Sequence, residues 1–353
     1  MARHPLERDL AYVLDETKDL WEDLRGQRLF LTGGTGFVGT WLVETFVWAN
    51  RELNLGANVT VLSRNPERFR DKAPESACDR CLTLVQGSLS NFDLPSHEYP
   101  FVIHAATDQT PAPTRDEPGG TFDRELAGTR RVLELARHGK TRRLLFTSSG
   151  AVYGKQPPGI PRLPEDYLGA PETTDVHSGY GQAKRASEFL CTLYGQQYGF
   201  EPLIARLFAF AGPHLPLNLN FALGNFVRDA LSGGPIRIAG DGTPRRSYLY
   251  AADLAIWLWT ILLHGRASRP YNVGSDQEVS IGQLAQRVVA TGAPGVRIEI
   301  AQSPKLGMPP ARYVPSVDRA REELGLEVKV GLDEATRRMF EWHRARETQL
   351  NFP

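Results

Sequence analysis

The sequence predicts an α/β protein in which a doubly wound parallel sheet is followed by a smaller C-terminal lobe. Short, almost wholly apolar segments alternate with longer helical patterns through the first two thirds of the 353 residues. This alternation is typical of a parallel sheet whose two faces are both covered by helices. From about residue 212 onward, Pro and Gly are more frequent and regular periods are fewer, which indicates a change of architecture.

The expected elements follow one another in a regular order. Strands are expected at 29–32, 58–62, 82–85, 101–104, 143–147 and 202–206. Helices are expected over about 6–24, from Phe37 onward, and over 122–137, 180–198 and 253–264. Ligands of such sheets bind beyond the carboxyl ends of the strands, so the residues that follow each strand are the candidates for a site.

A glycine-rich turn joins the first expected strand to the first long helix. Its glycines have the spacing GxxGxxG, and an apolar helix pattern follows. The free N–H groups of a helix N-terminus bind anions, and glycines allow a sharp turn and the close approach of a pyrophosphate. Strand, turn and helix therefore predict a dinucleotide site. The residues expected to bind the cofactor here are Gly33, Thr35, Gly36, Phe37, Val38 and Gly39.

The composition limits the kinds of partner that we expect the protein to bind. Lys plus Arg and Asp plus Glu each total 41, so no positive surplus exists to bind a nucleic acid backbone. The N-terminus lacks a signal-peptide pattern, and the most apolar later stretch, 254–264, is too short to span a bilayer. We therefore expect a cytoplasmic protein with neither nucleic acid nor membrane as a partner. Cys78 and Cys81 have no second ligand pair nearby, so no metal site is expected.

Three polar residues after expected strands indicate proton-transfer chemistry. Tyr180 and Lys184 lie four residues apart in an expected helix, so their side chains share one face. An ammonium beside a phenol favours the phenolate, which can exchange a proton with a substrate hydroxyl. Ser149 follows the fifth expected strand, where its hydroxyl can bind the reacting oxygen.

With these motifs in order, the chain resembles the extended short-chain dehydrogenase/reductase family, in its nucleotide-sugar epimerase/dehydratase branch. The resemblance runs from about residue 28 to 326. It rests on the glycine turn, the His-Ala-Ala run 104–106, Ser149 in an SSxxVYG-like run, Tyr180 with Lys184, Arg206 with Gly212 and Pro213, the segment 240–253, Tyr271 to Gly274, and Arg312.

The resemblance implies a Rossmann-type domain and assigns roles to these residues. Tyr180 would be the general base and acid, Lys184 would hold the nicotinamide ribose, and Ser149 would bind the reacting sugar oxygen. Arg246 and Arg312 would clamp the pyrophosphate of a nucleoside diphosphate sugar, because a planar guanidinium fits phosphate well. Further expected cofactor contacts are Ser88, Leu89, Ala105, Ala106 and Phe208. A homodimer is also implied.

The sequence pattern also divides the chain. A helical extension is expected over residues 1–25, and the dinucleotide-binding domain with Tyr180 and Lys184 over 26–211. Residues 212–353 are expected to form most of a substrate-binding lobe, with 250–275 packing back on the Rossmann-type domain.

The end of the second expected strand bears on the choice between NAD and NADP. Sites that prefer NAD commonly place an acid there to bind the ribose hydroxyls. This chain has Ser63 and Arg64 instead, which favour a 2′-phosphate. We therefore expect NADP to be preferred over NAD.

The residues after Ser149 bear on the reaction. Dehydratases of the family carry an Asp-Glu pair, and decarboxylases a Glu, where this chain has Gly150 and Ala151. Both reactions are disfavoured, which leaves a 4-epimerase or, as the alternative, an NADPH-dependent 4-ketoreductase. A catalytically silent NADP-binding scaffold is less favoured because Tyr180, Lys184 and Ser149 are all present.

Four further residues bear on the site. Two of them depart from the family pattern, and two are polar side chains expected near the site. Ala209 and Glu125 stand where the family often has Asn, which bears on the identity of the sugar nucleotide. Asp108 is a candidate for sugar binding, and His177 could act near Tyr180, although a structural or solvated role is favoured for each.

Overall fold

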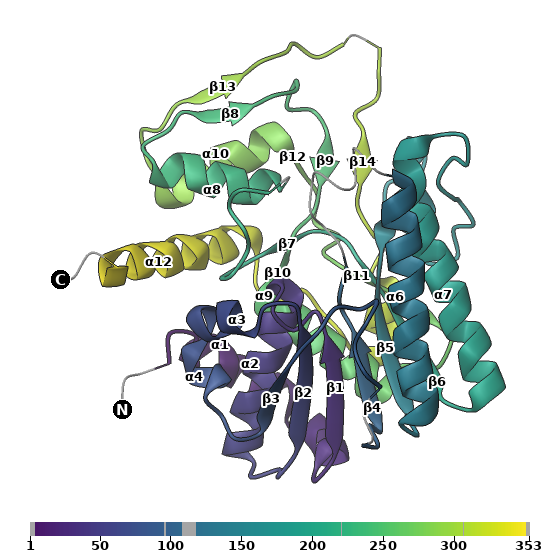
Figure 1. The fold of residues 1–353 in the computed structure, drawn as a ribbon. Coiled ribbons are helices and arrows are strands. Elements are labelled where there is room, and N and C mark those ends of the chain that lie inside the picture. Colours follow the sequence, from purple (N-terminus) through teal and green to yellow (C-terminus); the bar gives the residue numbers. More distant parts are fainter. Residues whose placement is uncertain (1–3, 95–96, 108–117, 220, 306, 351–353) are drawn as a thin grey trace.

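A seven-stranded parallel sheet forms the centre of the computed structural model, with strand order β11-β6-β5-β4-β1-β2-β3 (Figure 1). The structure describes residues 4–94, 97–107, 118–219, 221–305 and 307–350. The strands are β1 (Arg28–Thr32), β2 (Asn58–Ser63), β3 (Leu82–Gln86), β4 (Phe101–His104), β5 (Arg143–Ser149), β6 (Glu201–Leu207) and β11 (Pro270–Val273). The strand order reverses between β1 and β4, which is where a doubly wound sheet opens its ligand crevice.

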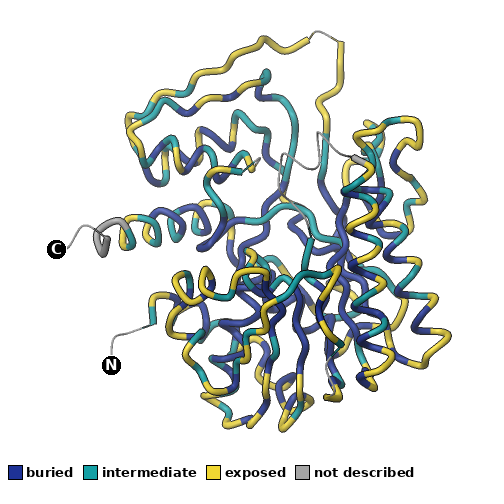
Figure 2. Tube along the Cα trace, in the orientation of Figure 1, coloured by how far each residue is buried: buried dark blue, intermediate teal, exposed yellow. Residues whose placement is uncertain are grey.

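Both faces of the sheet are covered, as the apolar strands predict. Along β1, Leu29 and Leu31 pack into one core while Phe30 packs into another. The first core lies under α2 (Phe37–Glu52) and α9 (Ala251–His264), and the second lies under α6 (Pro118–His138) and α7 (Gly179–Tyr198). Figure 2 shows the strands mostly buried and the outer sides of α6 and α7 exposed. The predicted doubly wound α/β class is therefore confirmed.

Helix α9 is buried along nearly its whole length, which explains its apolar sequence. Its Trp259 indole N–H donates to the Thr45 hydroxyl of α2 at 2.9 Å. The strand that follows, β11, pairs in parallel with β6 and extends the sheet. Among the described residues, no helix is both long and apolar enough to cross a membrane.

The N-terminal segment packs on the first core through α1 (Glu7–Thr17) and the 3-10 helix η1 (Lys18–Leu24). Two buried acids tie distant segments together. Asp9 accepts a hydrogen bond from the Tyr250 hydroxyl at 2.7 Å and pairs with Arg338. Asp253 accepts from the Tyr12 hydroxyl at 2.8 Å and from the backbone N–H of Val330 at 2.9 Å.

A second, smaller layer lies above the carboxyl ends of the strands (Figure 1). It contains α8 (Ala222–Leu231), β8 (Ile236–Ile238), β9 (Arg245–Arg246), β12 (Val279–Ser280), α10 (Ile281–Gly292), β13 (Ile298–Ile300) and β14 (Arg312–Tyr313). Strand β9 is the middle strand of a three-stranded sheet in the order β12-β9-β14. Ser280 and Gln283 form a capping box that begins α10.

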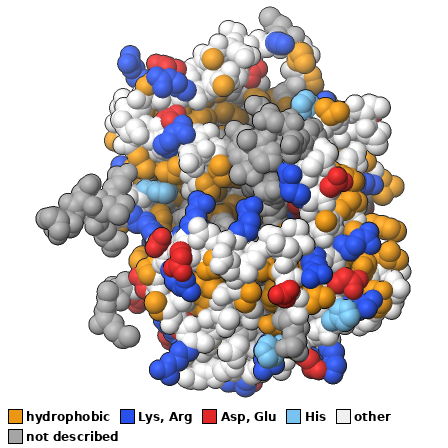
Figure 3. All heavy atoms as spheres, viewed as in Figure 1, with side chains coloured by type: hydrophobic (Ala, Val, Ile, Leu, Met, Phe, Trp, Pro, Cys, Tyr) orange, Lys and Arg blue, Asp and Glu red, His pale blue; other side chains and the backbone are white. Residues whose placement is uncertain are grey.

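The remaining elements connect or flank these layers. They are α3 (Pro66–Lys72), α4 (Pro74–Ala77), η2 (Gly150–Tyr153), η3 (Val176–Ser178), β7 (Phe210–Ala211), β10 (Leu249–Tyr250), α11 (Asp318–Leu324) and α12 (Leu332–Leu350). Lys and Arg side chains show on the face of Figure 3 at the level where the smaller layer meets the sheet.

Candidate active site

The glycine turn lies at the reversal of strand order and needs its glycines for separate reasons. Gly33 has a φ of +75°, and a Cβ there would lie 2.5 Å from the Ala106 nitrogen after β4. A Cβ on Gly39 would lie 2.2 Å from the Gly33 carbonyl oxygen, so the helix packs directly on the turn. Gly36 is exposed and caps α2, leaving the first N–H groups of the helix accessible. These features fit the pyrophosphate of a dinucleotide.

Lys72, from the short helix α3, also lies at this turn, and sequence reasoning did not select it. Its ammonium donates to the Thr40 hydroxyl at 2.9 Å and to the Gly36 carbonyl at 3.4 Å. Burial lowers the pKa of Lys72 to about 8, against the opposing effect of Glu44. Only folding brings residue 72 back to residue 36, so no local pattern could have revealed this contact.

Tyr180 and Lys184 share one face at the start of α7, as their spacing predicts. The Lys184 ammonium lies 5.9 Å from the centroid of the Tyr180 ring and donates to the Thr147 carbonyl at 3.2 Å. The contact with Thr147 joins α7 to the carboxyl end of β5. A phenol beside an ammonium at a strand end can exchange a proton with a hydroxyl placed above it.

Lys184 has a charged partner that the sequence did not assign to it. The Glu125 carboxylate on α6 pairs with its ammonium, and the two side chains are only 4% and 1% exposed. The Thr107 hydroxyl donates to the other Glu125 oxygen at 3.2 Å. Burial alone would lower the pKa of Lys184, but Glu125 and Tyr180 outweigh it, so the pKa lies above its ordinary value.

Ser149 ends β5 and caps the 3-10 helix η2, whose Ala151 N–H donates to the Ser149 hydroxyl at 3.2 Å. The Tyr313 hydroxyl from β14 lies near Ser149. Burial raises the pKa of Tyr313, so its phenol stays neutral. Tyr313 was not selected from the sequence, although it directly follows Arg312.

Because Gly150 has no side chain, the Tyr313 and Phe208 side chains occupy the space beside it. A Cβ on Gly150 would lie 2.6 Å from the Tyr313 hydroxyl and 2.7 Å from the Phe208 ring. The centroids of the Phe208 and Tyr313 rings lie 4.6 Å apart. Phe208, a predicted cofactor contact, is therefore found beside Ser149 and Gly150.

A buried network holds the carboxyl ends of β5 and β6 in place. Arg206 donates to both oxygens of Glu188, at 3.0 and 2.7 Å, and to the Tyr153 hydroxyl at 2.9 Å. Glu188 also accepts from the Ser148 hydroxyl at 2.5 Å. Ser148 directly precedes Ser149, so this bidentate pair fixes the strand end that carries the candidate hydroxyl.

His104 supports the site from below as a neutral imidazole. Its Nδ1 lies 2.8 Å from the Thr32 hydroxyl and its Nε2 lies 3.3 Å from the Thr129 hydroxyl. Burial and the charge of Lys184 lower the pKa of His104 to about 3. The side chain therefore links β1, β4 and α6 without a charge.

Arg246 and Arg312, the two arginines of the implied clamp, lie on the paired strands β9 and β14 and have different partners. Arg312 pairs in register with Arg245, and both donate to Glu278 at 2.9 Å. Arg246 pairs in register with Tyr313 and lies over its ring, 5.8 Å from the centroid. Successive strand residues point to opposite faces, so Arg246 lies on the Tyr313 side and Arg312 on the other.

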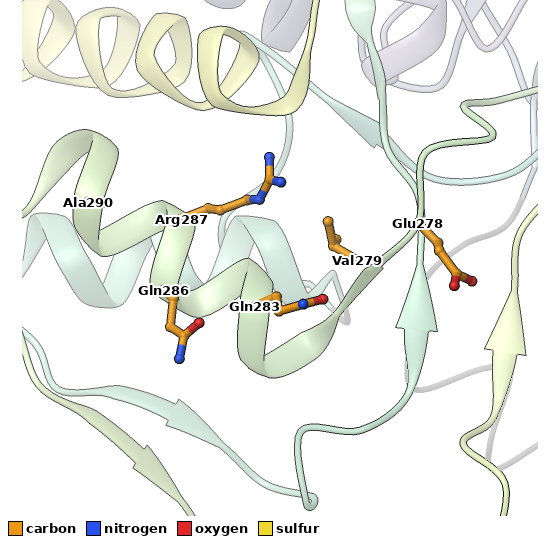
Figure 4. Close-up of a pocket in the computed structure, with 6 residues that line it drawn as sticks. All are labelled: Glu278, Val279, Gln283, Gln286, Arg287 and Ala290. Carbon is orange, nitrogen blue, oxygen red and sulfur yellow. The ribbon is translucent and has the colours of Figure 1, made fainter.

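Glu278 also borders a hollow of about 320 Å³ formed with α10 (Figure 4). Figure 4 shows Glu278 extending away from the helix that carries Gln283 and Arg287. None of the residues that line the hollow belongs to the Tyr180 site. Nothing in its lining supports a reaction centre.

The carboxyl end of β2 borders a larger hollow, of about 460 Å³. Its lining includes Arg64, Asn65 and Arg70 on one side and Gln86 of β3 on the other. Ser88 lies just beyond β3, and its hydroxyl donates to Asn91 at 2.6 Å. Leu89 packs against Gly128 of α6, where a Cβ would lie 2.9 Å away.

Other candidates take less defined positions. Asp108 falls outside the described residues, and His177 is exposed in η3. Cys78 and Cys81 are free thiols. In the described ranges, no group of three or more His, Cys, Asp or Glu side chains is arranged to hold a metal.

A doubly wound sheet with a glycine turn at its strand reversal and a Tyr-Lys pair at a neighbouring strand end defines a class of dinucleotide-dependent enzyme. Sequence comparison gives the family. The NAD dependent epimerase/dehydratase family matches residues 29–274, and the chain belongs to it as an enzyme of that family.

Curated relatives match along most of their length. UDP-glucuronic acid decarboxylase 5 of Arabidopsis thaliana is 30% identical over 319 residues, covering 90% of each chain. UDP-glucuronic acid decarboxylase 1 of Xenopus tropicalis is 28% identical and covers 96% of this chain and 77% of its own.

Solved structures share the fold. A UDP-glucose 4-epimerase from Thermotoga maritima with UDP-glucose has a TM-score of 0.76 and 23% identity, covering 91% of this chain and 100% of its own. A dTDP-glucose 4,6-dehydratase from Streptomyces venezuelae with NAD bound has a TM-score of 0.77 and 22% identity, covering 92% of this chain and 98% of its own. At this identity, the likeness supports the fold alone.

Proposed function

We propose that this protein is a nucleotide-sugar 4-epimerase that moves a hydride at C4 of a nucleoside diphosphate sugar. The observation that carries the proposal is the combination of Ser149, Tyr180 and Lys184 with no acid at positions 150 and 151. Hydride transfer needs only the first three side chains. Elimination and decarboxylation in this family use an acid that this chain lacks there.

The chemistry of the residues follows from their positions. Tyr180 takes the proton of the sugar hydroxyl as the carbon is oxidised and returns it as the carbon is reduced. Lys184 stabilises the phenolate, and Ser149 hydrogen-bonds the same sugar oxygen while the proton moves. A nicotinamide cofactor held at the glycine turn supplies the hydride acceptor and donor. An epimerase also needs room for the keto-sugar to present its other face.

The decarboxylase relatives make UDP-glucuronate a necessary test. Their similarity extends over nearly the whole chain. However, Ala151 has no proton to give or take. Position 150 also cannot supply an acid, since Tyr313 and Phe208 occupy the space in front of it. The local chemistry therefore favours hydride transfer without loss of carbon dioxide.

The smaller layer is proposed as the substrate-binding lobe. Strands β9 and β14 bring Arg246 and Tyr313 toward Ser149, where a sugar nucleotide bound above the sheet would lie. Arg246 is the guanidinium on that side and is proposed to contact the pyrophosphate. Arg312, bound to Glu278, is proposed to support the β9-β14 pair.

A second candidate function, an NADPH-dependent 4-ketoreductase, is favoured by one observation. Arg64 lines the hollow at the end of β2, where the carboxylate typical of NAD sites would repel a 2′-phosphate. A reductase releases oxidised cofactor in each cycle and fits an NADP site. The family's name and the NAD-bound solved neighbours point instead to NAD, so cofactor preference is itself a test.

One incubation separates these functions. The purified protein is supplied with UDP-, dTDP-, GDP- and CDP-sugars, UDP-glucuronate and 4-keto sugars, with NADH and NADPH in parallel. NMR reads the sugar products and nicotinamide absorbance reads cofactor consumption. C4 inversion without net cofactor loss supports the epimerase, and stoichiometric NADPH loss supports the reductase. Release of carbon dioxide or of water would overturn both.

We also propose a homodimer formed through α6 and α7. Helix α7 exposes the large apolar side chains Phe189 and Leu193, which lie four residues apart on one face, and Phe189 is 67% exposed. Isolated apolar residues are common on surfaces, but two neighbours on one helix face favour a partner. Light scattering after gel filtration gives the mass, and Phe189→Glu is expected to convert a dimer to a monomer.

A further inference from the structure

Lys184 lies at the base of the site beside the Glu125 carboxylate, which has no role in the mechanism proposed above. Its side chain is 1% exposed and that of Glu125 is 4% exposed, so water screens their interaction only weakly. A buried charge needs a partner, and an ammonium beside a carboxylate satisfies both groups. Glu125 comes from α6 and Lys184 from α7, so the pair also joins the two helices.

The geometry shows how the pair positions the ammonium. Lys184 has three N–H donors. One donates to the Thr147 carbonyl at 3.2 Å, and the ammonium forms an ion pair with Glu125. The Thr107 hydroxyl donates to Glu125 at 3.2 Å and orients the carboxylate in turn. These contacts fix the ammonium at the end of β5.

The groups around Lys184 differ in whether they can balance the positive charge of its ammonium. His104 of β4 is neutral and offers no counter-charge. On α7 itself, Tyr180 and Cys191 lie near the ammonium. The Phe146 ring of β5 lies 4.8 Å away and carries no charge. Glu125 is therefore the carboxylate that offsets the cost of burying this ammonium.

We propose that Glu125 is a positioning residue that holds the Lys184 ammonium at the base of the site and keeps it charged over the working pH range. A neutral amide of the same shape could fill the space and accept from Thr107. It could not supply the negative charge. The carboxylate is thus the feature that sets how far into alkaline pH the Lys184 ammonium keeps its charge.

The test rests on the proposed function only in assuming that Lys184 contacts the bound cofactor. NADH and NADPH binding is titrated by nicotinamide fluorescence from pH ~6 to ~10 in wild type, Glu125→Gln and Lys184→Met. Glu134→Gln is the matched control, because Glu134 lies on the same helix and pairs with Arg137 outside the site.

Wild type and Glu134→Gln are expected to keep their affinity up to the top of this range, because the pKa of Lys184 lies above its ordinary value. Glu125→Gln is expected to lose affinity within the range, because removing a nearby opposite charge lowers the pKa of Lys184 by about one to two pH units and leaves the effect of burial unopposed. Lys184→Met is expected to bind weakly with no such transition. Superimposable curves for wild type and Glu125→Gln would overturn the proposal.

A second measurement, of thermal stability, needs no cofactor. It therefore tests the role of Glu125 even if the proposed function is wrong. Lys184 has a raised pKa in the folded state, so its contribution to stability is full below its unfolded pKa. That contribution is lost as pH rises through the folded pKa. The melting temperature of Glu125→Gln is therefore expected to fall below wild type near neutral pH and to approach it at alkaline pH. A constant gap at all pH values would mean that Glu125 only packs.

Discussion

The Tyr313 hydroxyl lies where a side chain on residue 150 would have to start, 2.6 Å from the position of a Cβ on Gly150. The Phe208 ring closes the same space from the other side at 2.7 Å. Real Cβ atoms do not tolerate such contacts, so position 150 is restricted to glycine while Tyr313 and Phe208 hold their places. The absence of a side chain at position 150 is thus built into the packing around it.

The first prediction follows from this contact. Gly150→Ala is expected to lower the free energy of unfolding by about 1–3 kcal/mol, the usual cost of overpacking. Gly159→Ala is the control, because a Cβ there meets nothing within 4 Å. Urea denaturation measures both. Equal stability of the two variants would mean that Tyr313 moves aside at little cost.

The second prediction concerns the proton-transfer role proposed for Tyr180. Tyr180→Phe removes the hydroxyl and keeps the ring, so turnover of the sugar substrate is expected to fall about 10²- to 10⁴-fold. Cofactor affinity and melting temperature are expected to stay near wild type. Tyr198→Phe makes the same change on the exposed end of α7. A Tyr180→Phe variant with wild-type turnover would assign the proton transfer to another group.

The strands and the Tyr-Lys pair could be predicted from the sequence because their signals are local. Apolar runs mark buried parallel strands, and a spacing of four places Tyr180 and Lys184 on one helical face. The seventh strand, Pro270–Val273, was not predicted as a strand. It is short and begins with Pro, and it is stabilised by its pairing with β6.

Several contacts that define the site could not be predicted, because they join segments distant in the chain. Glu125 meets Lys184 only when α6 packs on α7, and Tyr313 meets Ser149 only through the smaller layer. The sequence grouped Arg246 with Arg312, yet the strand register places them on opposite faces. Side-chain direction in two-residue strands depends on pairing, which a single sequence does not specify.

The third prediction tests the cofactor preference. Arg64→Leu is expected to weaken NADPH binding about 10- to 100-fold, the effect of losing a charge-assisted hydrogen bond to phosphate, and to leave NADH binding unchanged. Dissociation constants from nicotinamide fluorescence check it. Arg237→Leu, on β8 in the smaller layer, controls for the loss of a surface charge. Tighter binding of NADH than of NADPH by wild type would contradict the preference itself.

The last prediction uses the neutral His104 beneath the site. Burial and Lys184 hold its folded-state pKa at about 3, well below the ordinary value of 6.5. The unfolded chain therefore takes up a proton at His104 as pH falls below 6.5, while the folded chain does not. Stability from this group is full above pH 6.5 and is lost as pH falls toward about 3.

Between pH ~7 and ~4.5, the free energy of unfolding of His104→Asn is expected to fall by about 2–3 kcal/mol less than that of wild type. In wild type, each pH unit below the pKa of the unfolded chain lowers the free energy of unfolding by about 1.4 kcal/mol. Urea denaturation at the two pH values measures the difference. His138→Asn changes an imidazole that is 52% exposed, and its loss of stability should match wild type. Equal acid sensitivity of His104→Asn and wild type would show that His104 takes up a proton in the folded protein, and the site would then carry a charge beneath Lys184 at low pH.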